Sequence, residues 1–428
     1  MPEVHEERSR RLPFAFTEFD PAVRREVIYI DASDAGQSFG VLYRPPTHDP
    51  RTVVYLMHPR AEFTRHYVVP GLTARGYAVF GQDSRYLNND SDMVHERLLL
   101  DIAAGLRRLR EVGFERIVLL GNSGGGSLLG FYQSQAGQPP QARIAATPSG
   151  EPIDLVQEEM PPGDLYVAVA AHPGEGRFML NVLDPAVVDE ANPIATDAAW
   201  DMYNAANGYR PFPEPSHYPA EWLRQYRARQ RERNRRLDSV AREYLADHAY
   251  FRDRLRHAEF PSQSEEVRQA VTRHARLGRY MTIYRTLANP AYLDLAIDPS
   301  NRPRGSIFSP GDPVIGNYGP GGLARVMTPR AWLSTWSGLS SQADLPDTIR
   351  HITVPTLIVY ADADCDIFPA EQAELLANCA AADKTLEVLP WASHYLHPVG
   401  AEGAKLGDPR QRLIDLIVPW IEERIGEP

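Results

Sequence analysis

Apolar residues follow two patterns along the chain: short continuous runs, and longer stretches with helical spacing. Two partly apolar segments near the start, 26–33 and 38–45, predict a leading β-hairpin. Continuous apolar runs of strand length are typical of parallel strands that are covered on both faces. Runs of this kind occur in the first half of the chain at 52–59, 77–85, 116–123 and 165–171.

Helical patterns lie between strand-like runs. Residues 92–111 carry apolar side chains three or four positions apart, which predicts an amphipathic helix. After residue 350 two further apolar runs appear, at 356–360 and 385–389, and a helical pattern follows each. Alternating strands and helices indicate a parallel sheet with right-handed crossovers.

The middle of the chain departs from this alternation. Between about 173 and 350 no run is typical of a core strand, and helical spacing predicts one helix through 237–255. The pattern also predicts a second helix, whose apolar residues are Val267, Val271, Met281 and Tyr284. The Pro/Gly-rich segment 299–322 is expected to be a long loop.

Together these patterns predict an α/β fold: a mostly parallel central sheet flanked by helices, with a large, mainly helical insertion after the sixth strand. We divide the chain into a lead-in at 1–24, a core formed by 25–172 and 350–428, and the insertion at 173–349. A chain of 428 residues is long enough for such a division.

Charge and composition narrow the class of partner. A net charge of −11 gives no general attraction to nucleic acid or to anionic membranes. The apolar runs are too short for a membrane-spanning helix, and the first residues lack the apolar segment of a secretory signal. The two cysteines, Cys365 and Cys379, suit a reducing compartment. We therefore expect a cytoplasmic protein that binds neither nucleic acid nor membranes.

One stretch of the insertion is strongly basic. Residues 223–236 contain seven arginines, interleaved with Gln, Glu and Asn. This interleaving predicts a solvated helix face. An anion-binding patch, for example for the phosphates of a coenzyme A thioester, is the alternative.

A serine lies between glycines where the apolar run RIVLL ends, in Gly121-Asn122-Ser123-Gly124-Gly125. A phosphate-binding P-loop would need a lysine after its last glycine, and a dinucleotide fingerprint would need a glycine where a leucine stands. The remaining pattern is G-x-S-x-G, which places a serine on a strained turn between a strand and a helix. We predict that Ser123 is a nucleophile.

A nucleophilic serine needs a base and an acid that orients the base. With this motif the expected chain order is serine, acid, histidine. The run at 356–360 is followed by three candidate acids, and we choose Asp364 over Asp362 and Asp366 because it follows the turn at the strand end.

The candidate base follows the run at 385–389. Two histidines lie there, His394 and His397. We choose His394 because it lies in the short loop directly after the strand, whereas His397 precedes a proline at the start of the next loop.

Backbone amides are expected to stabilise the oxyanion. The N–H of Gly124, at the start of the helix, is the first donor. The second should come from the loop after the third strand, where Pro59 has no N–H, so Arg60 is the predicted donor, with Ala61 as the alternative. His58 is assigned a structural role, with substrate contact as the alternative.

These motifs resemble those of the serine hydrolases of the α/β-hydrolase superfamily, esterase-like and with a large cap insertion. The resemblance rests on the nucleophile elbow, on the order Ser123, Asp364, His394, and on VPTLIVYADAD before a late helix. Asp-Ser-Arg at 83–85 also resembles a structural turn of the family. The chain departs from the family where His-Pro-Arg replaces the common His-Gly segment, and where Ala361 replaces a glycine.

The resemblance implies a serine hydrolase that cleaves a carboxylic ester or lactone through an acyl-enzyme, with a capped pocket for a bulky or aromatic substrate. A C–C bond (diketone) hydrolase, a thioesterase or an amidase would use the same residues. A non-catalytic ligand-binding protein of the same fold is the alternative of another class.

Further expectations concern ligands and partners. The mechanism requires no cofactor, and no set of His, Cys and carboxylate residues has metal-ligand spacing, so neither is expected. The expected partner is a small-molecule substrate. Self-association as a homo-oligomer, through 299–322 and the cap, is left open.

Overall fold

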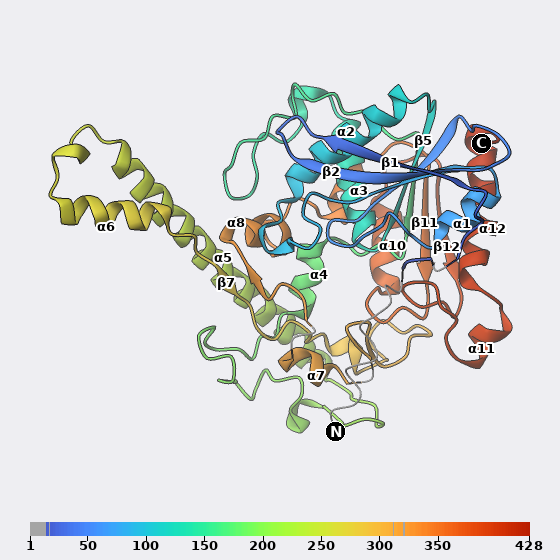
Figure 1. The fold of residues 1–428 in the computed structure, drawn as a ribbon. Helices are drawn as coiled ribbons and strands as arrows, with labels where there is room; N and C mark the ends of the chain where they lie inside the picture. Colours follow the sequence, from blue (N-terminus) through green and yellow to red (C-terminus); the bar gives the residue numbers. More distant parts are fainter. Residues whose placement is uncertain (1–13, 17, 311, 320–321) are drawn as a thin grey trace.

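The computed structural model describes residues 14–428 except 17, 311 and 320–321. Most of the predicted lead-in, residues 1–13 and 17, therefore lies outside the described residues. In the described part, the centre of the molecule is an eight-stranded sheet (Figure 1). From edge to edge its strands are β1 (Arg24–Asp31), β2 (Gln37–Arg44), β4 (Ala78–Gln82), β3 (Thr52–Met57), β5 (Arg116–Asn122), β6 (Leu165–Val169), β11 (Thr356–Ala361) and β12 (Lys384–Leu389).

The directions of the strands follow the predicted pattern. β1 and β2 form the antiparallel hairpin, and β2 also pairs antiparallel with β4. The remaining pairings in this sheet are parallel. The carboxyl ends of β3, β5, β6, β11 and β12 therefore meet at one edge of the sheet, where sites of α/β proteins form.

Helices cover both faces of the sheet. α1 (Val68–Ala74) and α12 (Pro409–Ile425), which the short α11 (Gly400–Lys405) precedes, pack on one face. α2 (His95–Glu111), α3 (Gly124–Ala136) and α10 (Pro369–Asn378) contribute to the core on the other.

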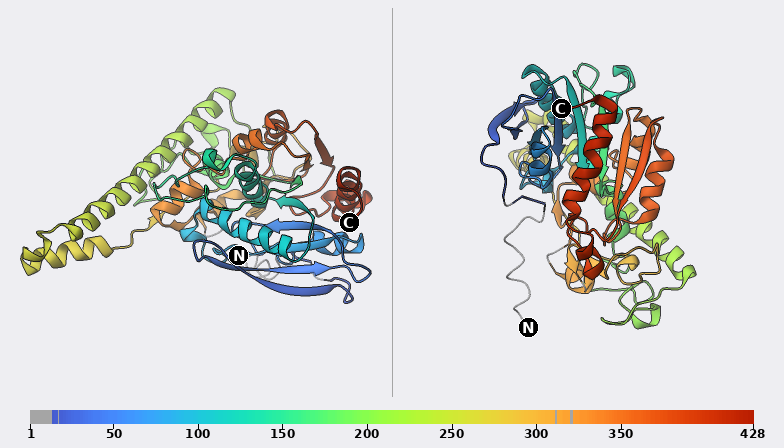
Figure 2. Two further views of the ribbon diagram at one scale, coloured as in Figure 1. Left: turned by 90° about the horizontal axis from the view of Figure 1, so that it is seen from above. Right: turned by 90° about the vertical axis from the view of Figure 1, so that its right-hand side faces the viewer.

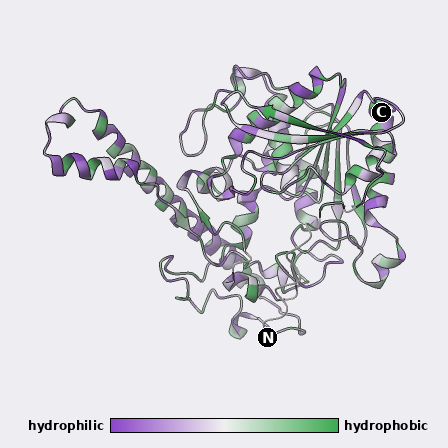
Figure 3. Ribbon diagram, in the orientation of Figure 1, coloured by the Kyte–Doolittle hydropathy of each residue, from purple (hydrophilic) through white to green (hydrophobic). Residues whose placement is uncertain are grey.

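A central strand is apolar throughout because it contributes to both cores. On β3, Tyr55 lies in one core, while Val54 and Leu56 lie in the other. Figure 3 shows these central strands largely in the colour of hydrophobic residues. A strand buried on both faces has no polar positions to alternate with its apolar ones.

The insertion lies between β6 and β11 and is mainly helical. Its helices are α4 (Glu175–Val182), α5 (Ala220–Arg256), α6 (Glu265–Arg276), α7 (Pro313–Tyr318), α8 (Pro329–Ala331) and α9 (Leu345–Thr348). Its described strands, of two residues each, are β7 (Met281–Thr282), β8 (Gly305–Ser306), β9 (Ser309–Pro310) and β10 (Val326–Met327). The predicted fold class is confirmed.

The second predicted helix of the insertion is shorter than its apolar pattern indicated. α6 ends at Arg276, so Met281 and Tyr284 lie outside it. Met281 belongs instead to β7, where it pairs with Met327 of β10. Leu277 takes an extended conformation and Gly278 follows, which is costly inside a helix, so the helix stops there.

α5 and α6 form an arm that projects from the rest of the molecule (Figures 1 and 2). α5 has 37 residues, and its buried residues all lie at or before Ala241. Beyond that point α5 packs mainly against α6. In the part of the chain that the structure describes, no helix, α5 included, is both long and apolar enough to cross a membrane.

The prediction that 223–236 forms a solvated face is wrong for part of the segment. Arg233 on α5 is 0% exposed. Its guanidinium donates two hydrogen bonds to Glu190, of 2.8 and 2.7 Å, and others to the carbonyl oxygens of Asp184 and Tyr284. Arg227 likewise donates to Asn181 and other groups of the insertion. These arginines hold loops of the insertion against α5, which composition alone could not indicate.

Truncating this buried arginine should destabilise the insertion. Arg233→Ala leaves the Glu190 carboxylate and the carbonyl oxygens without their donor, so we expect a loss of about 3 kcal/mol in the free energy of unfolding. Urea unfolding followed by tryptophan fluorescence measures it. Arg231→Ala, an exposed arginine of the same helix, is the matched control and should change stability by less than about 0.5 kcal/mol. Equal effects of the two substitutions would contradict the role given to Arg233.

Candidate active site

Ser123 lies at the sharp turn between β5 and α3. β5 ends at Asn122 and α3 begins at Gly124, so one residue makes the turn. Its backbone has φ 56° and ψ −127°, a conformation that is strained for a residue with a side chain. Strain of this kind persists where the surroundings hold it, and it directs the hydroxyl toward the carboxyl edge of the sheet.

Glycines around the serine are required by close contacts. A side chain at Gly121 would begin 2.5 Å from the carbonyl oxygen of Gly125, where helix and strand meet. A side chain at Gly124 would begin 2.9–3.0 Å from the ends of His58, His172 and Glu175. The turn is thus packed against the sheet on one side and against polar side chains on the other.

The structure brings together Ser123, His394 and Asp364. Ser123 Oγ lies 2.8 Å from His394 Nε2, and His394 Nδ1 lies 2.6 Å from Asp364 Oδ2. Because Nδ1 faces the carboxylate, it donates its proton there, and Nε2 is left to accept the serine proton. Asp364 is held in turn by the backbone N–H groups of Asp366 and Ile367. All three side chains are buried.

Burial alone would lower the pKa of His394. The adjacent carboxylate of Asp364 overrides this effect and raises the pKa above its ordinary value of 6.5. The imidazole is therefore a stronger base than a free histidine and can hold a proton taken from Ser123.

The two other aspartates of the same turn have different partners. Asp362 accepts hydrogen bonds from the side chain of Asn301 and from the backbone of Trp391. Asp366 accepts them from Tyr292, Ser306 and the backbone of Ile307, at 2.7–2.9 Å. Both connect the turn to neighbouring segments, and neither forms a hydrogen bond with His394 among the described contacts, although the charge of Asp366 adds to that of Asp364 in raising the pKa of His394.

His397 is exposed and lies near Arg410, away from the serine. Of the two candidate histidines, only His394 contacts Ser123 among the described contacts.

The backbone groups of the two predicted oxyanion donors differ in their hydrogen bonds. Gly124 begins α3, so its N–H is among those without a partner inside the helix. The backbone N–H groups of Arg60 and Ala61, however, both donate to His58 Nδ1, at 3.0 and 2.9 Å. The predicted second donor is engaged elsewhere.

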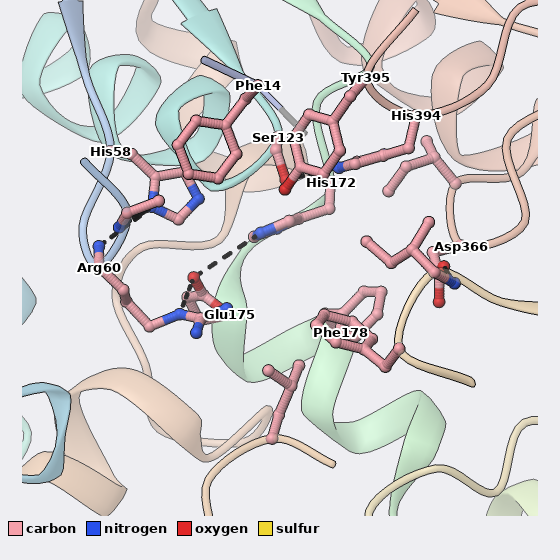
Figure 4. Close-up of a pocket in the computed structure, with 15 residues that line it drawn as sticks. Phe14, His58, Arg60, Ser123, His172, Glu175, Phe178, Asp366, His394 and Tyr395 are labelled. Carbon is pink, nitrogen blue, oxygen red and sulfur yellow. Dashed lines mark hydrogen bonds and ion pairs between the residues drawn. The ribbon is translucent and has the colours of Figure 1, made fainter. Parts of the chain in front are cut away.

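A polar cluster that sequence reasoning missed lies beside the serine (Figure 4). Glu175, at the start of α4, accepts a 3.0 Å hydrogen bond from Arg60 Nε, and its carboxylate lies 3.9 Å from His172 Nε2. Burial would raise the pKa of Glu175, but the charge of Arg60 overrides burial and lowers it to about 2. Burial lowers the pKa of His172 to about 4. The cluster therefore holds an ion pair and neutral imidazoles near pH 7.

These side chains line a cavity of about 200 Å³ that also reaches Ser123 and His394. Three phenylalanines line it: Phe14 from the lead-in, and Phe178 and Phe308 from the insertion. Apolar spacing could not indicate these residues, because none lies on a strand of the sheet. Across the described residues, no group of three or more His, Cys, Asp or Glu side chains is arranged to hold a metal ion.

The burial of Asp366 generates a prediction about stability. Burial first, and Asp364 second, raise its pKa from 3.8 to about 6. A carboxyl whose pKa is higher in the folded state stabilises the fold fully below its unfolded pKa, and this contribution is lost as pH rises through the folded one. The stability of Asp366→Asn relative to wild type should therefore increase between about pH 4 and about pH 6.

Urea unfolding at several pH values measures this difference. Asp415→Asn, on the exposed side of α12, makes the same change of charge and should show no comparable trend. A difference between Asp366→Asn and wild type that is constant across this pH range would contradict the prediction.

Comparisons with known proteins find likeness in structure alone. No protein-family model matches the sequence, and no curated protein matches it. The chain is similar to the esterase domain of a Rhodothermus marinus protein, with 12% identity, 94% of this chain and 98% of that one covered, and a TM-score of 0.42. An esterase from Pyrococcus furiosus has 11% identity, coverage of 98% of both chains and a TM-score of 0.42. DcsB, solved with a substrate analogue, has 11% identity, coverage of 94% and 99%, and a TM-score of 0.49.

Likenesses this distant carry no argument about activity, so the fold is assigned from the topology of this chain. The order and direction of the strands, the helical insertion after β6 and the serine at the β5–α3 turn give the described part of the chain an α/β-hydrolase fold.

Proposed function

We propose that the protein is a serine hydrolase that cleaves a carboxylic ester or lactone through an acyl-enzyme. The observation that carries this proposal is the hydrogen-bonded series Ser123–His394–Asp364, whose serine and histidine line a cavity at the carboxyl edge of the sheet. A serine, an imidazole and a carboxylate in this arrangement are the elements of nucleophilic acyl transfer.

The steps follow from the geometry. His394 Nε2 takes the proton of Ser123 as the hydroxyl oxygen attacks the substrate carbonyl, and the carbonyl electron pair moves to its oxygen. Asp364 holds the imidazole in position and stabilises its charge. The tetrahedral species collapses, and the leaving alcohol takes the proton from His394. Water then attacks the acyl carbon while His394 takes a proton from the water. When the second tetrahedral species collapses, Ser123 takes that proton and the acid is released. The N–H of Gly124 donates to the oxyanion.

The size and lining of the cavity favour a substrate that carries a compact apolar group. A void of about 150 Å³ is enough for a benzene-sized ligand. The volume here, about 200 Å³, fits one ring or a short branched chain beside the reacting carbonyl. The phenylalanine side chains favour such a group through apolar contact.

Experiments can distinguish the proposed reaction from related hydrolase reactions and from a non-catalytic binding protein. A thioesterase, an amidase and a diketone C–C hydrolase would use the same three residues. Arg233, one of the seven arginines of 223–236, is buried, so it gives no support for binding the phosphates of coenzyme A. A non-catalytic binding protein would keep the cavity without a reactive serine. We retain a cytoplasmic location and a small-molecule partner as predictions.

A fluorophosphonate probe tests the proposed nucleophile. We expect wild type to be labelled covalently and Ser123→Ala not to be labelled, because the probe reacts with an activated serine hydroxyl. Gel fluorescence, with mass spectrometry of the labelled peptide, measures the reaction. Ser127→Ala, a buried serine in the first turn of α3, is the matched control and should be labelled as wild type is. An unlabelled wild type would refute the proposed hydrolase.

The pH dependence tests the proposed base. His394 must be neutral to accept a proton, so kcat/KM for an aryl ester should rise with pH through an inflection above 6.5. Asp364→Asn should lower kcat by about 10⁴-fold. It should also move the inflection to lower pH, because the charge that raises the pKa of His394 is removed.

Asp362→Asn is the control for this profile, because Asp362 lies in the same turn without contacting His394. It should leave the inflection where wild type has it. A shift of the inflection in Asp362→Asn but not in Asp364→Asn would show that Asp364 is not the acid that orients His394.

A further inference from the structure

The loop after β3 directs its backbone donors toward its own histidine. The N–H groups of Arg60 and Ala61 both donate to His58 Nδ1, at 3.0 and 2.9 Å. An amide that has an internal acceptor must break that bond before it can serve an oxyanion. The second donor that a tetrahedral intermediate requires has to come from another group.

The same two bonds determine the protonation of His58. A nitrogen that accepts from two N–H groups carries no proton of its own, so the neutral ring carries its proton on Nε2. Burial, and next the charge of Arg60, lower the pKa of His58 well below 6.5. The ring of Phe63 packs against the imidazole with centroids 4.9 Å apart, which limits its rotation. Nε2–H is thus a fixed, neutral hydrogen-bond donor.

The position of this donor is beside the nucleophile. His58 Nε2 lies 2.9 Å from the point where a side chain of Gly124 would begin. Ser123 and His58 line the same cavity, and Figure 4 shows the imidazole directed toward the space in front of the serine. Gly124 follows Ser123 directly, at the start of α3.

We propose that His58 Nε2–H is the second oxyanion donor of this enzyme, in place of a backbone amide of the loop. The proposal rests on the serine hydrolase function proposed above. As the bond from Ser123 Oγ to the carbonyl carbon forms, the C=O π pair moves to the oxygen, and the serine proton goes to His394. His58 donates a hydrogen bond to the developing O⁻ and keeps its proton throughout. When the C=O bond reforms, the leaving oxygen takes the proton from His394.

A neutral imidazole suits this task. A side-chain imidazole can contribute to an oxyanion hole, and a histidine held neutral by its surroundings polarises a carbonyl without transferring its proton. The salt bridge between Arg60 and Glu175 is a positioning contact, because it anchors the loop whose amides orient His58.

His172 is one competing donor, and the hydroxyl of Tyr395, which lines the same cavity and interacts with Ser123, is another. Nδ1 of His172 also accepts a backbone N–H, from Gly174, and its Nε2 lies 3.0 Å from the same point at Gly124. Nε2 of His172, however, lies 3.9 Å from the ionised carboxylate of Glu175, which competes for its proton. His58 forms no ion pair with a carboxylate among the described residues, although the charge of Glu175 also acts on its imidazole and by itself raises its pKa.

Two substitutions separate the acceptor role of His58 Nδ1 from the donor role of its Nε2–H. A third substitution tests His172. His58→Asn keeps an acceptor where Nδ1 stands and removes the donor. His58→Gln places an amide N–H near the position of Nε2. His172→Asn is the matched variant on the opposite wall. Hydrolysis of 4-nitrophenyl acetate and the rate of fluorophosphonate labelling are measured for each, together with thermal unfolding and the pH inflection of His394.

We expect His58→Asn to lower kcat/KM and the labelling rate by about 10²–10³-fold, with KM within about threefold of wild type and the pH inflection unchanged. His58→Gln should keep activity within about tenfold, and His172→Asn should lose less than His58→Asn. If His58→Asn does not fold, retention of activity in His58→Gln supports the donor role, and a 10³-fold loss there overturns it.

The proposal is overturned if His58→Asn folds and keeps wild-type rates, or if the Asn and Gln variants lose activity equally. A wild type that reacts with neither probe overturns the hydrolase function itself, and the His58 proposal with it. A reactive wild type together with a fully active His58→Asn overturns only the assignment of the donor.

Discussion

The imidazole of His394 depends on two hydrogen bonds whose partners come from different strands of the sheet. Ser123 follows β5 and Asp364 follows β11, while His394 follows β12. Distances of 2.8 and 2.6 Å hold only if the register of these strands and the shapes of three turns are fixed together. The parallel sheet supplies this constraint, because it places the carboxyl ends of β5, β11 and β12 at one edge.

The turn that carries Asp364 shows how this constraint is maintained. Its two neighbouring aspartates form hydrogen bonds with other segments: Asp366 with residues of the insertion, and Asp362 with the loop before His394. Three carboxylates within a span of five residues thus have three separate sets of hydrogen-bond partners. The insertion is thereby connected to the loop that orients the base.

The sequence predicts those features that depend on local pattern or on chain order. The apolar runs identified the strands, because burial on both faces leaves no polar alternation, and the G-x-S-x-G turn identified Ser123. The order serine, acid, histidine located His394. Asp364 could be separated from its neighbours only by its position after the strand, since residue type is the same at all three positions.

Other features depend on contacts that residue type does not reveal. Arg60 was expected to donate its amide to an oxyanion, but the amide is bound by His58 two residues earlier, and the direction of that ring is set by tertiary packing. Arg233 was expected on a solvated face, but its partners are loop carbonyl groups and a glutamate 43 residues away in the sequence. Helical periodicity likewise extended past Gly278, where the backbone leaves the helix.

Phe14 gives the beginning of the chain an unexpected importance. Its ring packs against Phe63 and Tyr395, and it forms part of the cavity wall, although it precedes the first strand by ten positions. A fragment trimmed to start at β1 would retain every strand of the sheet yet lose one side of the chamber in which the serine lies. The part of the chain that forms the sheet and the part that encloses the cavity therefore differ in this protein.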